Sequence, residues 1–142
     1  MRAFVVGGTL LAVTSQTLAV ELPSQIRYLY EESAEFGCKI TDRAVQILDL
    51  QGDGTKFYIV DTSKISCKKT AWCGSGGCSL SIYVKKFNSY KEIFGNNIQT
   101  HFFRKAKKGY ELFVEYKLIG TARYHFDSGC AKELGKNNEP FC

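Results

Sequence analysis

The sequence lacks the residue patterns on which most enzymes depend. It has only two histidines, His101 and His125, and neither lies beside a Gly-x-Ser-x-Gly motif or an unpaired cysteine. Catalysis needs a positioned base together with a nucleophile or paired acids, and the carboxylates are too scattered to mark a glycosidase pair. We therefore expect a protein that is not an enzyme. A small hydrolase that uses His101 or His125 is the alternative.

A strong excess of one charge and a second long apolar run are also missing. The chain has 19 Lys and Arg against 14 Asp and Glu, a net charge of +5. Nucleic-acid-binding proteins usually show a stronger, localised basic excess, so we do not expect nucleic acid as a partner. After residue 19, no apolar run approaches the roughly 20 residues of a membrane-spanning helix, and no transmembrane segment is expected.

The N-terminus has the three regions of a secretory signal peptide. Arg2 is followed by the uncharged run 3–13, a short polar stretch over 14–16 and a small residue, Ala19. This order predicts export and cleavage near Ala19, which places the protein in the periplasm or outside the cell. The alternative is a buried N-terminal strand.

All six cysteines lie after the predicted cleavage site, and they are Cys38, Cys67, Cys73, Cys78, Cys130 and Cys142. An even number in an exported chain indicates three disulfide bonds. A zinc site would need paired C-x2-C spacing, usually with histidines, and no such pair occurs. We predict one bridge between Cys130 and Cys142, with the other two drawn from the remaining four cysteines.

Hydrophobic periodicity predicts one helix followed by short strands. Ile26, Leu29 and Tyr30 recur at helical spacing after Ser24, a typical N-cap residue, and predict a helix over 24–35. The predicted strands are 44–50, 56–61, 78–85, 90–94, 98–103, 110–118 and 121–126, with a turn at 95–97 and a polar tail from residue 127. The expected fold is therefore mainly β (α+β), an antiparallel meander or sandwich of six to seven short strands with an N-terminal helix. It forms a single disulfide-stapled domain over residues 20–142.

One segment matches the first half of an EF-hand-type calcium loop. Asp49, Gln51 and Asp53 place oxygen donors at positions 1, 3 and 5, and Gly54 follows at position 6. The second half of the loop lacks its bidentate carboxylate, so the set falls short of the usual six to eight oxygen ligands of Ca²⁺. We favour a tight turn between two strands, and keep Ca²⁺ bound by Asp49 and Asp53 as the alternative. No other cofactor is expected.

Two loops are candidates for binding. The glycine-rich stretch Cys73–Cys78 needs clamping, for which a disulfide is suited, and it could present Trp72 or backbone amides to an anion. The basic loop with Arg104, Lys105, Lys107 and Lys108 could contact an acidic partner, a phosphate-rich surface or an anionic polymer. The simpler interpretations are a stapled turn for the first loop and a solvated hairpin for the second.

Part of the chain resembles a group of small uncharacterised exported proteins of alphaproteobacteria. The resemblance covers roughly residues 44–95 and rests on a D-x-x-G-D-G turn at 49–54, a strand at 57–61, Cys67 and a C-G-S-G-G-C loop at 73–78. In those proteins the turn reads D-x-N-G-D-G and is similar to the calcium-loop motif of FG-GAP or VCBS β-repeats. Here Gln51 replaces the Asn. The resemblance implies an exported β fold and no particular activity.

These observations together predict a non-catalytic exported bacterial protein that binds another macromolecule, with a protein as the expected partner. An inhibitor or a host-directed effector would have this character. The alternatives are a calcium-stabilised structural β module and a small secreted hydrolase.

Overall fold

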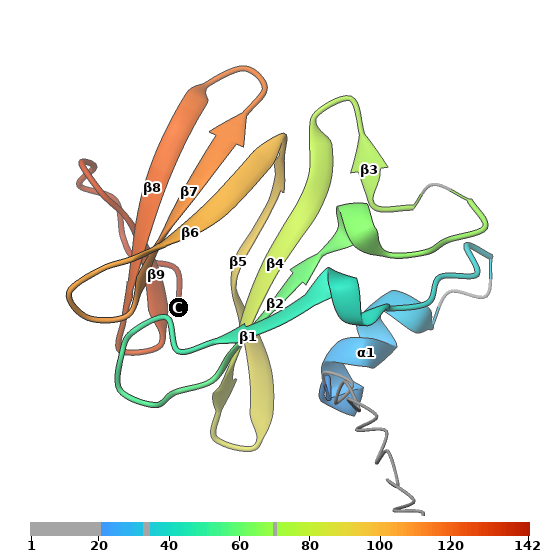
Figure 1. The fold of residues 1–142 in the computed structure, drawn as a ribbon, viewed down its shortest axis with the longest axis horizontal. Helices are drawn as coiled ribbons and strands as arrows, with labels where there is room; N and C mark the ends of the chain where they lie inside the picture. The colour runs from blue at the N-terminus through green and yellow to red at the C-terminus, as the bar shows by residue number, and fades with distance from the viewer. Residues whose placement is uncertain (1–20, 33–34, 70) are drawn as a thin grey trace, which may run out of the picture.

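A computed structural model describes residues 21–32, 35–69 and 71–142 of the chain (Figure 1). The predicted signal segment, residues 1–19, lies outside this range. Within the described residues, no helix is long and apolar enough to cross a membrane.

The fold is mainly β, with antiparallel sheets and one α-helix, as the sequence predicts. The described residues form nine strands rather than six or seven. The helical elements are α1 (Ser24–Glu31), η1 (Asp42–Ala44) and η2 (Thr62–Lys64), and the strands are β1 (Val45–Leu48), β2 (Phe57–Asp61), β3 (Cys73–Gly74), β4 (Gly77–Lys86), β5 (Ser89–Ile98), β6 (Thr100–Lys105), β7 (Tyr110–Tyr116), β8 (Gly120–Asp127) and β9 (Cys130–Glu133).

The first sheet is built around β4. This strand pairs with β2 and β3 along one edge and with β5 along the other, and β1 extends the sheet beyond β2. Residues 80–84 of β4 are all buried, because both faces of the strand are covered. A strand buried on both faces reads as a continuous apolar run, whereas a half-exposed strand alternates. Residues 79–84, S-L-S-I-Y-V, approach the continuous apolar run of a strand that is buried on both faces.

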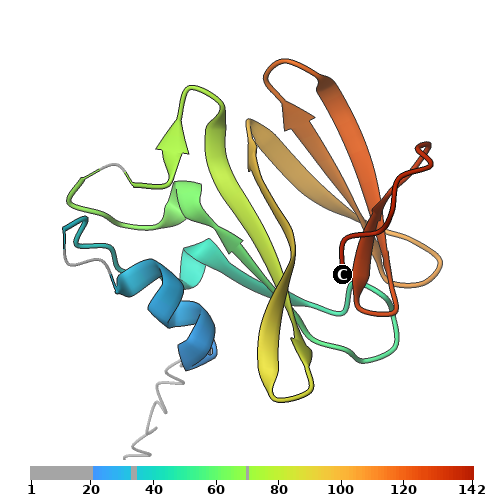
Figure 2. The same cartoon turned by 180° about the vertical axis from the view of Figure 1, so that it is seen from behind.

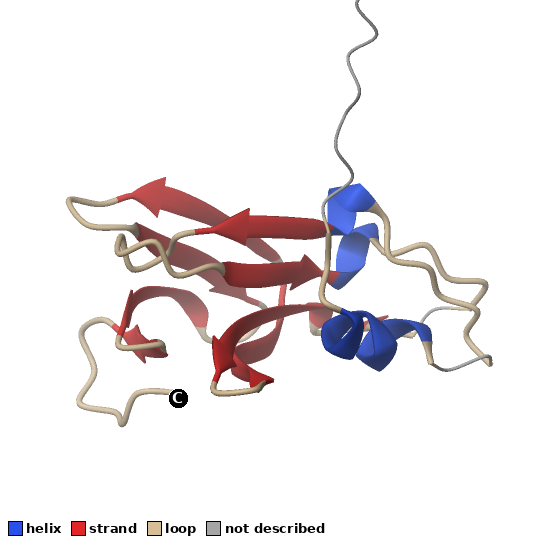
Figure 3. Cartoon of the chain, turned by 90° about the horizontal axis from the view of Figure 1, so that it is seen from below, coloured by secondary structure: helices blue, strands red, loops and turns tan. Residues whose placement is uncertain are grey.

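The second sheet is the meander β6-β7-β8-β9, joined to the first by a sharp corner. Only Gln99 separates β5 from β6, and its backbone N–H donates to the Glu115 carbonyl at 2.8 Å. The two sheets form two layers, with the helical turns gathered at one end (Figure 3). The chain therefore passes from one layer to the other within a few residues.

The main core fills the space between the two sheets. Phe57, Ile82 and Leu112 are fully buried there, and the aromatic pair Phe94–Tyr124 crosses the interface with ring centroids 5.0 Å apart. Tyr110, Leu112, Val114 and Tyr116 alternate inward along β7, as predicted, so opposite residues of that strand face outward. The core thus fixes which side chains of the second sheet reach its outer face.

A smaller apolar cluster lies on the other side of the first sheet, under α1. Ile26 and Tyr30 of the helix pack against Val60 and Tyr83, and the two tyrosine hydroxyls are 2.7 Å apart. Figures 1 and 2 show α1 on the side of the first sheet that faces away from the second. The helix ends at Glu31, earlier than predicted from its periodicity.

Two predictions about the later strands are wrong. The turn predicted over 95–97 is part of β5, where Gly95, Asn96 and Asn97 pair with residues 79–81 of β4. These residues are poor strand formers, but β4 offers them a partner along its length, and tertiary pairing overrides local propensity. The polar tail after Asp127 contains a further strand, β9, which pairs with β8 through a turn at Ser128 and Gly129.

All six cysteines form disulfide bonds. The bridges are Cys38–Cys67, Cys73–Cys78 and Cys130–Cys142. This confirms the predicted Cys130–Cys142 bridge and the prediction that three bridges form. Disulfides persist in oxidising compartments and are rare in the cytosol, so they favour an extracytoplasmic location.

Candidate functional site

The outer face of the second sheet is open to solvent. Along β6, β7 and β8, Phe103, Leu112 and Tyr124 point into the core, which turns their sequence neighbours outward. None of the described helices or strands packs over these outward side chains, and the ring of Phe102 is 58% exposed. An exposed face on an otherwise well-packed sandwich is the natural place to look for a binding surface.

Five side chains on this face form one connected cluster, which we name the Phe–Arg face: Phe102, Arg104, Glu111, Phe113 and Arg123. The rings of Phe102 and Phe113 stack in parallel, 4.8 Å apart, because the two residues are directly opposite each other in the β6–β7 register. The guanidinium carbon of Arg104 lies 4.6 Å from the centre of the Phe113 ring, and that of Arg123 lies 5.9 Å from it.

Glu111 holds both arginines of the Phe–Arg face. Its Oε2 atom is 3.3 Å from Arg104 Nη2 and 3.9 Å from Arg123 Nε. The two arginine side chains remain 60% and 47% exposed, and exposed ion pairs of this kind contribute only about 0–1 kcal/mol each to stability. The cluster therefore orients two guanidinium groups and an aromatic stack but contributes little to the stability of the fold. This is expected of a preorganised binding surface.

The predicted basic loop continues the Phe–Arg face. Arg104 belongs to both, and Lys105, Lys107 and Lys108 are exposed on the β6–β7 hairpin. The hairpin is closed by a 3.0 Å bond from the Ala106 N–H to the Gly109 carbonyl. The four predicted basic residues therefore lie together at the end of β6 and in its hairpin, with Arg104 on the Phe–Arg face and Lys105, which is paired with the core-packed Tyr110, on the opposite face of β6.

The basic loop packs against the predicted calcium-type turn, a contact that the sequence does not reveal. The Tyr110 N–H donates to the Leu50 carbonyl at 2.9 Å. Gly109 has a φ of 71°, and a Cβ at this position would lie 2.0 Å from the same carbonyl oxygen. A cavity of about 570 Å³ opens beside this contact and is lined by Gln51, Lys107, Lys108, His125 and Asp127, among others. The two loops thus form a single rim.

Asp49 organises the predicted calcium-type turn through its own carboxylate. The backbone N–H groups of Gly52, Asp53 and Gly54 donate to Asp49 at 2.7, 3.2 and 2.7 Å. Hydrogen bonds from Thr55 hold the pKa of Asp53 below its ordinary value. In the described part of the chain, no group of three or more His, Cys, Asp or Glu side chains is arranged to hold a metal. Calcium binding by Asp49 and Asp53 stays a prediction.

Gln51 connects the turn to the second sheet. Its side-chain amide donates to Asp53 Oδ2 at 2.7 Å, and its carbonyl oxygen accepts from the Gly129 N–H at 2.9 Å. The residue is buried. Because this one side chain bonds to two separate turns, it fixes the position of the rim relative to β8 and β9.

Trp72 lies under α1 rather than on the tip of its loop. Its ring is half-buried and packs against Tyr30, with ring centroids 5.2 Å apart. Its Nε1–H is buried and has no hydrogen-bond partner among the described residues. The adjacent bridge Cys73–Cys78 joins two residues that are paired in the β3–β4 register. This places the disulfide as a clamp on the hairpin that enters β4.

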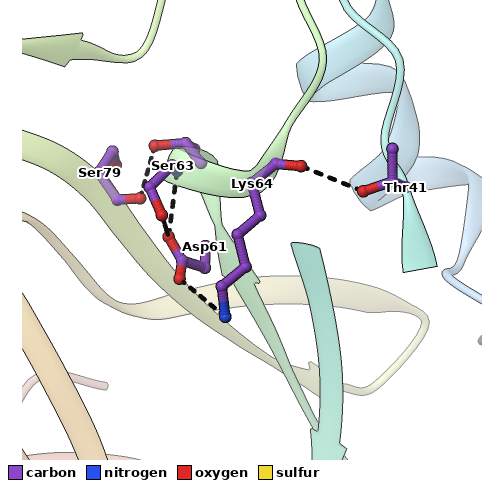
Figure 4. Close-up of polar contacts among 6 residues, drawn as sticks. Thr41, Asp61, Ser63, Lys64 and Ser79 are labelled. Carbon is purple, nitrogen blue, oxygen red and sulfur yellow. Dashed lines mark hydrogen bonds and ion pairs between the residues drawn. The ribbon is translucent and has the colours of Figure 1, made fainter. Parts of the chain in front are cut away.

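A groove between the two sheets brings His101, a candidate from the sequence, together with polar residues that the sequence did not associate with it. Cavities of about 440 and 290 Å³ share the lining residues Asp61, Lys64 and His101. Asp61 accepts hydrogen bonds from the Ser63 N–H and hydroxyl at 3.0 and 2.6 Å, and Lys64 Nζ is 3.5 Å from its other oxygen (Figure 4). The available signal was the D-T-S-K sequence at the end of a strand, which is typical of a capped turn.

The two histidines lie in different places. His101 is half-buried in the groove, and burial lowers its pKa, with the charge of Asp61 opposing that effect and the charge of Lys64 adding to it. His125 lines the cavity beside the basic loop, and its Nδ1 atom has no hydrogen-bond partner among the described residues. The hydroxyl of Ser63, which lines the groove with His101, donates to the carboxylate of Asp61.

Comparison with protein-family models, with curated proteins and with solved structures finds no match to this chain.

Proposed function

We propose that this protein is a non-catalytic, extracytoplasmic binding protein of the inhibitor or effector type, and that it docks on an acidic surface of a partner protein. The Phe–Arg face and the basic loop form its binding surface. The observation that supports this most directly is the exposed stack of Phe102 and Phe113 with two guanidinium groups held beside it.

The residue types on this surface favour a protein partner. Arginine and large aromatic residues are enriched at protein–protein interfaces and dominate their binding energy. Lys105, Lys107 and Lys108 are exposed on the hairpin that follows Arg104, and charges at the rim of an interface accelerate association with an acidic partner more than they tighten it. The three disulfides fit a protein that works in an oxidising compartment.

The test is capture of a partner by the oxidised protein, residues 20–142, from periplasmic and host extracts. Arg123→Ala and Phe102→Ala should each weaken saturable capture by at least about fivefold, since residues at the centre of an interface often cost more than 1 kcal/mol when truncated. Raising the salt concentration should slow association.

Arg27→Ala is the matched control. Arg27 also forms an exposed pair with a glutamate, Glu31, at 3.1 Å, but it lies on α1 at the far side of the molecule. Equal capture by wild type, Arg123→Ala and Phe102→Ala would contradict the proposal, and so would the recovery of no saturable partner.

A further inference from the structure

The hairpin between β4 and β5 ends in an exposed phenylalanine. Lys86 and Ser89 are paired, so the turn consists of Phe87 and Asn88 alone. Phe87 is 99% exposed. Figure 1 shows this hairpin extending past the other strands at the lower end of the molecule. A large apolar side chain at such a tip contacts nothing in its own fold.

The backbone at Phe87 has a conformation that normally selects glycine. Its φ is 55°, and a positive φ at the first position of a two-residue hairpin is the position at which type II′ turns place glycine. For a bulky residue, this backbone conformation is an outlier that needs a reason.

The other hairpins of the molecule follow the rule. The positive φ angles next to β4, β7, β8 and β9 are at Gly77, Gly109, Gly120 and Gly129. Only the turn before β9 adds a second positive-φ residue, Ser128, and that residue is small and polar. The β4–β5 tip therefore departs from this rule. A strained and exposed aromatic residue occupies a position where glycine would adopt the same backbone conformation without strain.

Two exposed lysines flank this aromatic tip. Lys85 and Lys91 are exposed on neighbouring rungs of the hairpin, whereas Lys86, directly before the turn, is half-buried and its side chain lies beside Gly129. Lys85 is opposite Tyr90, which packs toward the α1 side, whereas Lys91 is opposite the core residue Val84, so the two cations lie on opposite faces of the hairpin. An exposed apolar side chain flanked by lysines is complementary to a surface that has anionic groups above an apolar interior.

We infer that the β4–β5 tip docks on an anionic phospholipid bilayer, with Phe87 entering the interface and Lys85 and Lys91 among the headgroups. Aromatic side chains favour the level of the headgroups, and lysines near an anionic leaflet add attraction that salt screens. A single apolar contact gives only reversible binding. The tip thus holds the protein at a membrane surface without spanning it.

The test measures co-sedimentation of the oxidised protein, residues 20–142, with two kinds of vesicle. One contains phosphatidylglycerol and phosphatidylcholine, and the other phosphatidylcholine alone. Wild type should bind the first at least tenfold better than the second, with the difference reduced by added salt. Phe87→Gly should reduce binding to the anionic vesicles at least tenfold, while its melting temperature stays equal to or rises above that of wild type. Lys85→Glu combined with Lys91→Glu should also reduce binding.

Leu118→Ser is the matched control. Leu118 is 91% exposed at the β7–β8 tip, where Ile119 is 73% exposed and Lys117 is the one lysine of the turn, and the loss of Leu118 should leave vesicle binding unchanged. The inference is overturned if wild type ignores anionic vesicles or if Phe87→Gly binds them normally. It is also overturned if Phe87→Gly binds anionic vesicles normally but no longer captures the protein partner, because the tip would then dock in a pocket of that partner.

Discussion

The two sheets of this protein treat their outer faces in opposite ways. The first sheet buries its outer face under α1, where Ile26 and Tyr30 meet Val60 and Tyr83. The second sheet leaves its outer face open and places the Phe–Arg face there. Both use the same alternation of inward and outward side chains along antiparallel strands. The difference is in what the outward positions contact, and it separates the part of the molecule that supplies stability from the part that is available for binding.

The largest expected effect is on the free energy of unfolding, and it tests whether the covered face of the first sheet stabilises the fold more than the open face of the second. Ile26→Ala removes a side chain that is 1% exposed, and it should lower the free energy of unfolding by about 2–5 kcal/mol. Phe102→Ala on the open face should change it by no more than about 0.5–1 kcal/mol. Urea denaturation of the oxidised proteins measures both. Similar losses in the two variants would remove the distinction between the faces.

A second comparison uses two pairs of tyrosines. Tyr30 and Tyr83 share a buried hydrogen bond at 2.7 Å, so Tyr30→Phe removes this bond from a buried hydroxyl and should cost about 1–3 kcal/mol. Tyr116 and Tyr124 share a 2.9 Å bond in the second sheet, where Tyr116 is only half-buried. Water can replace the lost partner more easily there, and Tyr116→Phe should cost less. Thermal melts of the two variants rank them, and the reverse order would contradict the argument.

The smallest effect concerns pH and the groove between the sheets. Burial lowers the pKa of His101 in the folded protein, so the unfolded chain, with a pKa of about 6.5, binds the proton more tightly. The stability from the neutral imidazole is therefore complete above that pH and is lost as the pH falls through the lower folded pKa. Urea midpoints between pH 7.5 and 5 should decline, and His101→Gln should reduce the decline.

His125→Gln provides the control for this titration, since His125 lies outside the groove, beside the basic loop. A decline that survives in His101→Gln but disappears in His125→Gln would assign the pH dependence to the second sheet instead of the groove.

Much of this arrangement could be predicted from local sequence, and the failures have a common cause. The alternation of apolar and polar residues over 78–85 and 110–118 predicted the strands β4 and β7. The even number of cysteines after a signal-like segment predicted three disulfide bonds. The strand through Gly95–Asn97 was missed because its stability comes from pairing with β4. The Phe–Arg face was missed for the same reason, since Phe102 and Phe113 become neighbours only through the β6–β7 register. Asp61 and Lys64 are close in sequence, but His101 joins them only when the two sheets stack.

The central position of β4 has a consequence for how the molecule opens. Its amides are engaged with strands on both edges, and its middle five residues are shielded on both faces. Segments of this kind exchange their amide hydrogens only when the whole structure opens. In deuterated solvent, residues 80–84 should therefore retain protons longest, while the tips at Phe87 and Leu118 label within the earliest time points.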